Sequence, residues 1–147
     1  MPKVQNTLTE GNKNRLRTSI INGAVNFEQF LNDKTFFILC EDKSQTKIRF
    51  FQEEYKHLTG IYSDLEDAEF YSKCRQGHIS TGNIDTVQKY EWSTLKKKTG
   101  KIARLHEVLY SKADKSLLIN GLKTNTTVFT VALRNDEENI CIGFLQK

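Results

Sequence analysis

The sequence contains little proline, little cysteine and no long hydrophobic run. One proline and eight glycines among 147 residues leave no Pro/Gly-rich linker or low-complexity block. The longest apolar run is FFILC at residues 36–40, whereas a transmembrane helix needs about 20 apolar residues. The first ten residues contain no apolar signal segment either. We therefore expect one soluble, cytoplasmic domain over residues 1–147, because domains commonly have about 100–200 residues.

The scarcity of cysteine argues against a disulfide framework or a structural metal site. The three cysteines are Cys40, Cys74 and Cys141, and they form no Cys-x-x-Cys pair. No histidine stands at a zinc-ligand spacing from any of them. Two of the three lie in apolar segments, so we expect buried free thiols in a reducing compartment. The sequence predicts neither a metal nor any other cofactor.

Familiar catalytic loops are also missing. The sequence has no Walker-type phosphate loop, no Gly-x-Gly-x-x-Gly and no Gly-x-Ser-x-Gly. Its acidic segments EDK, SDLED and NDEE have the composition of polar turns and a helix start. None of them forms a metal-binding pattern, which disfavours a metal-dependent nuclease.

The charge that is present is mildly basic and clustered. The net charge is +4, which is compatible with a nucleic-acid partner. One cluster is Lys13, Arg15 and Arg17, and a second comprises the four lysines between residues 96 and 101. Both clusters can bind phosphate, or can be no more than solvated helix faces, because exposed charge needs no function.

Hydrophobic periodicity predicts a long first helix and two later ones. Apolar residues recur at steps of three and four over residues 9–32, where Thr7 and Glu10 have capping-box spacing. The same periodicity predicts helices over residues 64–76 and 93–111.

Local signals mark the ends of the two later helices. Ser63 and Glu66 have capping-box spacing at the start of the first, and Gly77 follows it as a terminating glycine. Gly100 lies inside the second helix and weakens it, because glycine disfavours a helix interior.

Period-two patterns predict strands in two groups. The first is a hairpin, in which residues 35–41 form a strand buried on both faces and residues 46–51 alternate between apolar and polar. The second group comprises residues 116–119, 126–134 and 139–145, and the turn NDEE joins the last two. Strands clustered at two places, with helices between, predict an α+β fold with a mostly antiparallel sheet.

One segment, YKHLTGIY at residues 55–62, combines several reactive groups directly after the predicted hairpin. Histidine can accept or donate a proton near neutral pH. If the backbone is extended there, His57 and Thr59 point to the same side, and Gly60 lets a ligand approach the backbone. This set suits a phosphodiester substrate. The alternative is a histidine packed at the corner of a small core beside Tyr55.

Basic residues around this segment are candidates to bind phosphate. Lys47, Arg49 and Lys56 can stabilise the charge that grows on a scissile phosphate. Arg104 and Arg134 are further candidates, because arginine can bind a phosphate through two parallel hydrogen bonds.

Aromatic rings near the segment have two alternative roles. The rings that can stack on unpaired bases are those of Tyr55, Tyr62, Tyr90 and Trp92. All four can equally belong to the core. Arg104 also has a structural alternative, because Glu107 lies one helix turn further along the chain.

Four segments in a fixed order carry a resemblance to a known family. They are IRFFQEEYKHLTGI, AEFYSKC, LKKKTGKIARLHEVL and NICIGFLQK. In this order they resemble the fourth class of the phage barnase–EndoU–colicin E5/D–RelE-like nuclease domains, which share the BECR fold. The resemblance covers about residues 15–147, is strongest at HLTG, and implies a helical N-terminal part packed on an antiparallel sheet. It also implies a metal-independent ribonuclease of phages or mobile elements, and it carries over onto His57, Thr59 and Gly60 only.

The leading hypothesis is therefore an endoribonuclease that acts as a toxin or host-takeover factor in a bacterial cell. A 2′-hydroxyl of RNA attacks the adjacent phosphorus and leaves a 2′,3′-cyclic phosphate. His57 transfers the proton, while Thr59 and the backbone at Gly60 hold a phosphoryl oxygen. Arg49 stabilises the developing charge. Lys47, Lys56, Tyr62, Arg104 and Arg134 are expected to bind the substrate.

Two other functions stay open. A catalytically inactive BECR-like module can inhibit a host nuclease or an RNA-guided defence complex, and the absence of an evident second acid–base residue favours it. A nucleic-acid-binding regulator would use the two basic clusters instead. The expected partners are RNA and a host or phage protein, such as an antitoxin or a defence complex, and none of the three functions involves a membrane.

Overall fold

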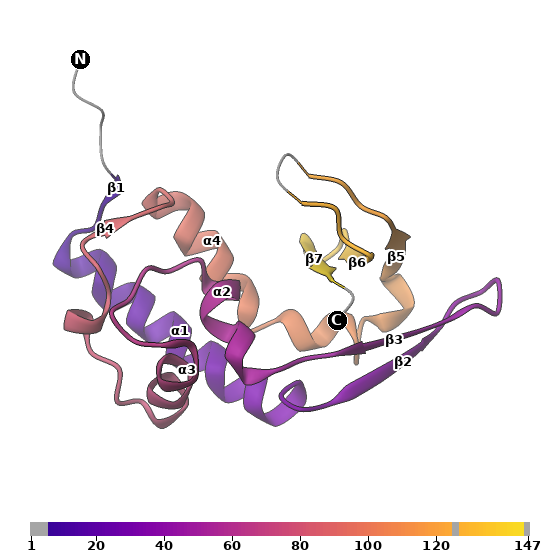
Figure 1. The fold of residues 1–147 in the computed structure, drawn as a ribbon, viewed down its shortest axis with the longest axis horizontal. Helices are drawn as coiled ribbons and strands as arrows, with labels where there is room; N and C mark the ends of the chain where they lie inside the picture. The colour runs from indigo at the N-terminus through magenta and orange to yellow at the C-terminus, as the bar shows by residue number, and fades with distance from the viewer. Residues whose placement is uncertain (1–5, 125–126, 146–147) are drawn as a thin grey trace, which may run out of the picture. The chain divides into compact units, whose positions relative to one another are not determined.

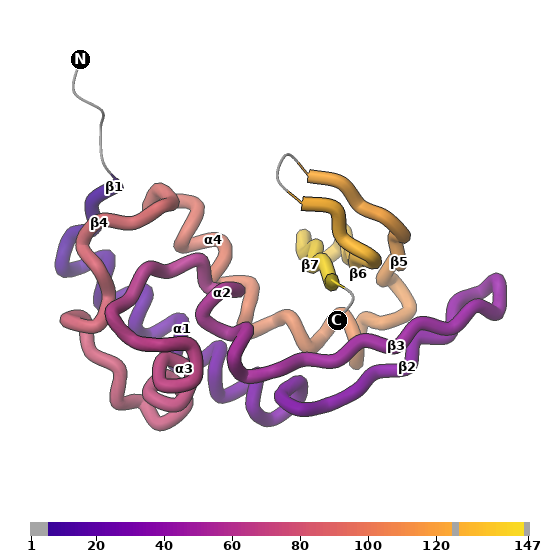
Figure 2. The backbone as a smooth tube through the Cα atoms, in the orientation of Figure 1, coloured from indigo at the N-terminus to yellow at the C-terminus, as the bar shows by residue number. Residues whose placement is uncertain are grey.

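The computed structural model describes residues 6–124 and 127–145. In these residues, α-helices combine with short antiparallel strands, which confirms the α+β class. The chain divides into two compact units. The helical unit comprises the chain up to Lys34 together with Phe50–Ala103, and the strand unit comprises Thr35–Arg49 together with the chain from Arg104 onward. Figure 1 labels the elements, and Figure 2 follows the backbone out along one hairpin and back.

The long helix α1, Glu10–Phe30, forms the base of the helical unit. Its N-cap is Thr9, whose hydroxyl accepts a hydrogen bond from the Asn12 amide, so the predicted capping role of Thr7 is wrong. Thr7 lies instead in the two-residue strand β1, Asn6–Thr7, which pairs with β4, Val87–Gln88. The buried face of α1 is Leu16, Ile20, Gly23, Ala24 and Phe27.

Three further helices pack around α1: α2 (Tyr55–Thr59), α3 (Asp67–Gln76) and α4 (Trp92–Ile102). Both α3 and α4 contact α1, and α2 contacts α3 and α4. The α3 helix begins three residues later than predicted, because the Ser63 hydroxyl accepts from the Leu65 amide and holds a turn there.

The sequence predicts the end of α3 correctly but not the end of α4. Gly77 ends α3 in the left-handed conformation, at φ 74°, as predicted. The last predicted helix is wrong beyond Ile102, where α4 ends. A separate 3₁₀ turn, Leu105–Val108, follows it in the strand unit.

The strand unit contains a hairpin and a three-stranded sheet. In the hairpin, β2 (Thr35–Leu39) pairs antiparallel with β3 (Gln45–Arg49). Burial on both faces of β2 is wrong, because Phe37 and Leu39 are 75% and 69% exposed and burial alternates along the strand. A hairpin with one covered face buries every second residue, whatever the hydrophobicity of the others.

The second part of the strand unit is the sheet β5 (Leu117–Asn120), β6 (Val131–Asn135) and β7 (Ile140–Phe144), in that order and antiparallel. The turn at residues 136–139 joins β6 to β7, which confirms the predicted hairpin. The β6 strand begins later than predicted, and residue 126 of that prediction lies outside the described residues.

The three cysteines are free but differ in burial. Cys74 is buried in α3, and this burial raises the pKa of its thiol to about 12. Cys40 is half-buried. Cys141 is exposed on β7, so its predicted burial is wrong: its side chain points away from the covered face of the sheet, while Ile140 is buried.

Candidate active site

The segment YKHLT is a helix and not the extended chain that the sequence suggested. Successive residues of a helix are rotated by about 100°, so residues two apart lie on different faces. His57 is accordingly exposed, whereas Thr59 is fully buried. The prediction that both side chains point to one side is therefore wrong.

The Thr59 hydroxyl has a structural role in this helix. Its oxygen, Oγ1, donates a hydrogen bond to the Lys56 carbonyl at 2.6 Å and accepts one from the Ile61 amide at 3.1 Å. With no exposed surface, it holds the helix end together. A direct contact between Thr59 and a substrate would require α2 to unwind.

Gly60 ends α2 in the left-handed conformation, at φ 73°. A Cβ atom at this position would lie 2.8 Å from Cε of Lys98 and 3.1 Å from the ring of Tyr90. The glycine therefore serves two purposes: it accepts a positive φ, and it lets two side chains from elsewhere in the helical unit pack onto the backbone. Sequence reasoning anticipated a close approach here, but by a ligand and not by Tyr90 and Lys98.

The ring of Tyr90 contacts two lysine ammonium groups. The Nζ atoms of Lys89 and Lys98 lie 5.3 and 5.4 Å from the centroid of its ring, within the range of cation–π interactions. We call His57, Gly60, Lys89, Tyr90 and Lys98 the motif surface. Tyr90 and Lys98 contact the backbone at Gly60, where α2 ends, and Lys89 contacts the other residues through the Tyr90 ring. His57 lies three residues before Gly60 and is exposed on the same short helix.

Lys56 and Tyr62 lie on either side of His57 and Gly60 in the sequence, and they differ in whether the side chain is held by a hydrogen bond. The Lys56 ammonium donates to the Leu65 carbonyl at 2.6 Å, so it holds the following turn. Tyr62 is 48% exposed. Its backbone is held by the buried Gln88 side chain, which accepts a hydrogen bond from the Tyr62 amide and donates one to the Tyr62 carbonyl. Tyr62 is thus a positioned, exposed ring, and Gln88 is a positioning residue that sequence reasoning missed.

The four residues chosen for charge and position belong to the strand unit. Lys47 and Arg49 are exposed on β3. The Arg134 guanidinium forms an exposed ion pair with Asp136 at 3.0 Å. The structure thus groups Lys56, Thr59, Gly60 and Tyr62 with His57 in the helical unit, and it places Lys47, Arg49, Arg104 and Arg134 in the other.

Arg104 belongs to an ion-pair network with Glu138, and not to the pair with Glu107 that was its structural alternative. Its guanidinium binds a carboxylate oxygen of Glu138 at 2.8 Å, and the other oxygen of Glu138 lies 2.7 Å from Nζ of Lys112. The Lys112 hydrogen bond, supported by Arg104, holds the pKa of the Glu138 carboxyl below its usual value. Hydrogen bonds to Glu138 and Glu137 raise the pKa of Lys112. The Arg104 guanidinium therefore has a structural partner within the strand unit.

Replacing Glu138 with glutamine should destabilise the strand unit in a pH-dependent way. Because the folded-state pKa of Glu138 is lowered, its ion pairs stabilise the protein above the ordinary carboxyl pKa of about 4.5, and this contribution disappears as the pH falls through the folded-state value. Urea denaturation should therefore show a lower midpoint for Glu138→Gln than for the parent at pH 7, and a shrinking difference below pH 4.5. Glu137→Gln, at an exposed carboxylate that also contacts Lys112, is the matched control and should have a smaller effect. A difference in urea midpoint between Glu138→Gln and the parent that is the same below pH 4.5 as at pH 7 would contradict this role of the ion pairs.

Neither a metal cluster nor a membrane-spanning helix is present among the described residues. They contain no group of three or more His, Cys, Asp or Glu side chains arranged to hold a metal ion. None of the helices in the described part of the chain is long and apolar enough to cross a membrane.

Comparison with known protein families identifies a family model that matches the chain. The family model described as phage-Barnase-EndoU-ColicinE5/D-RelE like nuclease4 matches residues 19–147, which include most of the helical unit and all of the strand unit. No curated protein and no solved structure matches the chain.

Proposed function

The chain belongs to the phage-Barnase-EndoU-ColicinE5/D-RelE like nuclease4 family, and we propose that within this nuclease family it is a metal-independent endoribonuclease. The observation that carries the proposal is the motif surface. There, the exposed His57 lies one turn before Gly60, onto which Lys98 and Tyr90 pack. An imidazole supplies acid–base chemistry, and the Lys98 ammonium group, which belongs to the side chain packed on Gly60, can stabilise phosphate charge.

In the proposed reaction, the 2′-oxygen of a ribose attacks the adjacent phosphorus. His57 accepts the proton of the 2′-hydroxyl, the new bond from phosphorus to the 2′-oxygen forms, and the bond to the 5′-oxygen breaks. The leaving 5′-oxygen takes up a proton from solvent. Lys98 stabilises the negative charge on the phosphoryl oxygens, and the products carry a 2′,3′-cyclic phosphate and a 5′-hydroxyl.

The other predicted residues divide into binding and positioning roles. Tyr62 is proposed to stack on a base beside the cleaved phosphate, and Lys47 and Arg49 to bind the RNA backbone. Thr59 and Lys56 act as positioning residues, because their hydrogen bonds hold the two ends of the turn that carries Gly60. In keeping with the family description, we further propose a phage or mobile-element origin and a toxin-like action in a bacterial cell, countered by a protein partner such as an antitoxin.

The test is incubation of the purified protein with total bacterial RNA in EDTA, followed by analysis of the fragments and their end groups. We expect discrete fragments that carry 2′,3′-cyclic phosphate and 5′-hydroxyl ends. Cleavage that requires Mg²⁺, or fragments with 5′-phosphate ends, would overturn the mechanism. Intact RNA at every salt concentration would overturn the enzyme itself and leave the inhibitory binding module as the function to pursue.

A further inference from the structure

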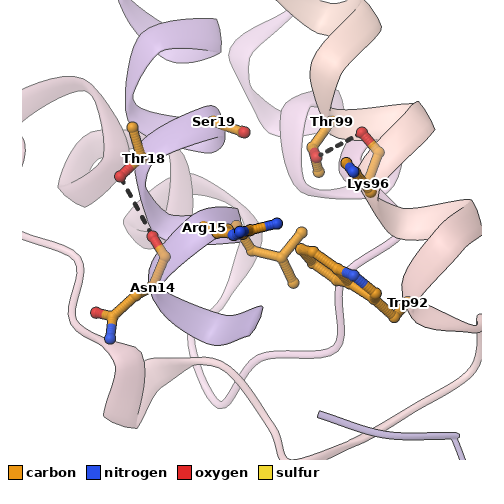
Figure 3. Close-up of a pocket in the computed structure, with 8 residues that line it drawn as sticks. Asn14, Arg15, Thr18, Ser19, Trp92, Lys96 and Thr99 are labelled. Carbon is orange, nitrogen blue, oxygen red and sulfur yellow. Dashed lines mark hydrogen bonds between the residues drawn. The ribbon is translucent and has the colours of Figure 1, made fainter. Parts of the chain in front are cut away.

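A second candidate site lies in the helical unit, in a pocket of about 450 Å³ between α1 and α4. Arg15, Thr18 and Ser19 of α1 line one side, and Trp92 and Lys96 of α4 line the other. Figure 3 shows the Arg15 side chain extending from α1 toward Trp92 and Lys96. None of the residues that line the pocket is acidic.

The cations of the two basic clusters are not equivalent. The Arg17 guanidinium donates to the carbonyls of Ile79 and Gly77, and the Lys13 ammonium donates to the Thr86 hydroxyl. These two side chains hold loops onto α1. By contrast, the side chains of Arg15 and Lys96 make no hydrogen bond or ion pair with any other residue that the structure describes. The pocket therefore gathers the two cations that have no structural partner there.

Trp92 adds the second part of a recognition site. It is the single tryptophan of the chain and is half-buried at the start of α4. The nearby Thr18 and Thr99 hydroxyls donate to the carbonyls of Asn14 and Leu95, so they are used within their own helices. What the pocket offers a ligand is thus an indole ring beside a guanidinium and an ammonium group.

These features fit a ligand that is both planar and anionic. A simple anion would leave the indole and most of the volume unused, and an apolar ligand would leave two cations without counter-charge. A nucleotide satisfies both, because its base can stack on an aromatic ring while its phosphate binds arginine and lysine.

We propose that the pocket between α1 and α4 binds one nucleotide of a single-stranded RNA, with its base on Trp92 and its phosphate on Arg15 and Lys96. This inference rests on the proposed function and names a substrate subsite for it. The α4 helix contacts both α1 and α2 and presents Lys98 to Gly60 of the motif surface. Lys96, two residues earlier, lies on a different side of the helix. The pocket thus binds a nucleotide other than the one at the cleaved phosphate. It increases the affinity for RNA and takes no part in the cleavage step.

The test uses Trp92 fluorescence, which reports on this pocket alone because the chain has no other tryptophan. A 2′-O-methyl oligoribonucleotide is the probe, since it lacks the attacking hydroxyl and stays intact. We expect it to quench the fluorescence on titration. Arg15→Ala and Lys96→Ala should each weaken binding by about tenfold, in line with a phosphate contact in a stacked site. Lys97→Ala is the matched control, because Lys97 is an exposed neighbour on α4 that does not line the pocket; it should change the Kd less than about twofold.

Several results would overturn the subsite. Equal losses for Lys96→Ala and Lys97→Ala would indicate general charge attraction, and equal quenching by polyglutamate would indicate a site for any polyanion. Binding seen by anisotropy of a labelled probe without quenching would place the RNA elsewhere. The cleavage assay separates the two proposals: cleavage without quenching removes the subsite and leaves the nuclease, whereas quenching without cleavage retains the subsite and removes the nuclease.

Discussion

Replacing His57 with alanine should lower the rate of RNA cleavage by about 10²–10⁴-fold, the usual contribution of a general acid–base residue. His57 is exposed on α2, so its removal deletes an imidazole without opening a cavity in the core. The variant should therefore have the circular dichroism spectrum and denaturation midpoint of the parent. Initial rates on a single-stranded RNA in EDTA measure the effect.

Two controls make the His57 result specific. His78→Ala changes another exposed histidine, in the turn that follows α3, and should cleave at the parental rate. The uncleavable 2′-O-methyl oligoribonucleotide should bind His57→Ala as tightly as the parent, because the imidazole acts on the proton and not on affinity. Parental cleavage by His57→Ala, or an equal loss in His78→Ala, would remove His57 from the mechanism.

The largest expected effect on stability comes from Tyr55, two residues before His57. Its side chain is fully buried, and its ring centroid lies 5.4 Å from that of Phe27 and 5.2 Å from that of Tyr71. Its hydroxyl donates to the Ile20 carbonyl at 2.6 Å. Tyr55→Ala should lower the free energy of unfolding by about 3–5 kcal/mol, as the loss of a large buried ring does. Single domains have a total stability of about 5–15 kcal/mol, so this is a large fraction of it.

The contribution of the hydroxyl can be separated from that of the ring. Tyr55→Phe keeps the ring and should cost only about 0.5–1.5 kcal/mol for the lost hydrogen bond. Tyr62→Ala, at a tyrosine that is exposed on the same segment, should lie within about 0.5 kcal/mol of the parent. Urea denaturation measures all three variants, and equal losses for Tyr55→Ala and Tyr62→Ala would contradict the position of Tyr55 in the core.

These predictions give YKHLTGIY both of the roles that its sequence left open. Tyr55 and Thr59 lie in the core and hold the helix, whereas His57 is exposed and Gly60 lies under Tyr90 and Lys98. A helix of five residues has both a buried and an exposed face, so one short motif can stabilise the unit and present a reactive group.

Several features of the fold were predictable because they rest on local physics. The step of three and four from Leu16 to Phe27 predicts the buried face of α1, since it matches the turn of a helix. Gly77 predicts the end of α3, because glycine accepts a positive φ without strain. The alternation around Ile48 predicts the covered face of β3.

Other features were beyond the reach of sequence patterns. An isolated helix as short as α2 is unstable in water, so it forms only because Tyr55 is buried against α1 and α3. The FFILC run is hydrophobic enough for a strand buried on both faces, yet hydrophobicity cannot say how many faces a neighbour covers. Arg104 likewise pairs with Glu138, 34 residues away, and not with the nearer Glu107.

The sequence by itself determined the α+β class, the long first helix, the helix-ending glycine and the family, because periodicity, φ preference and motif order are written along the chain. Only the tertiary structure decided which groups meet. In the folded unit Thr59 is buried, and Lys98 and Tyr90 pack on Gly60. Arg15 lines the same pocket as Trp92 and Lys96. Such contacts join residues far apart in sequence, and they depend on which helix faces become covered when the whole unit packs.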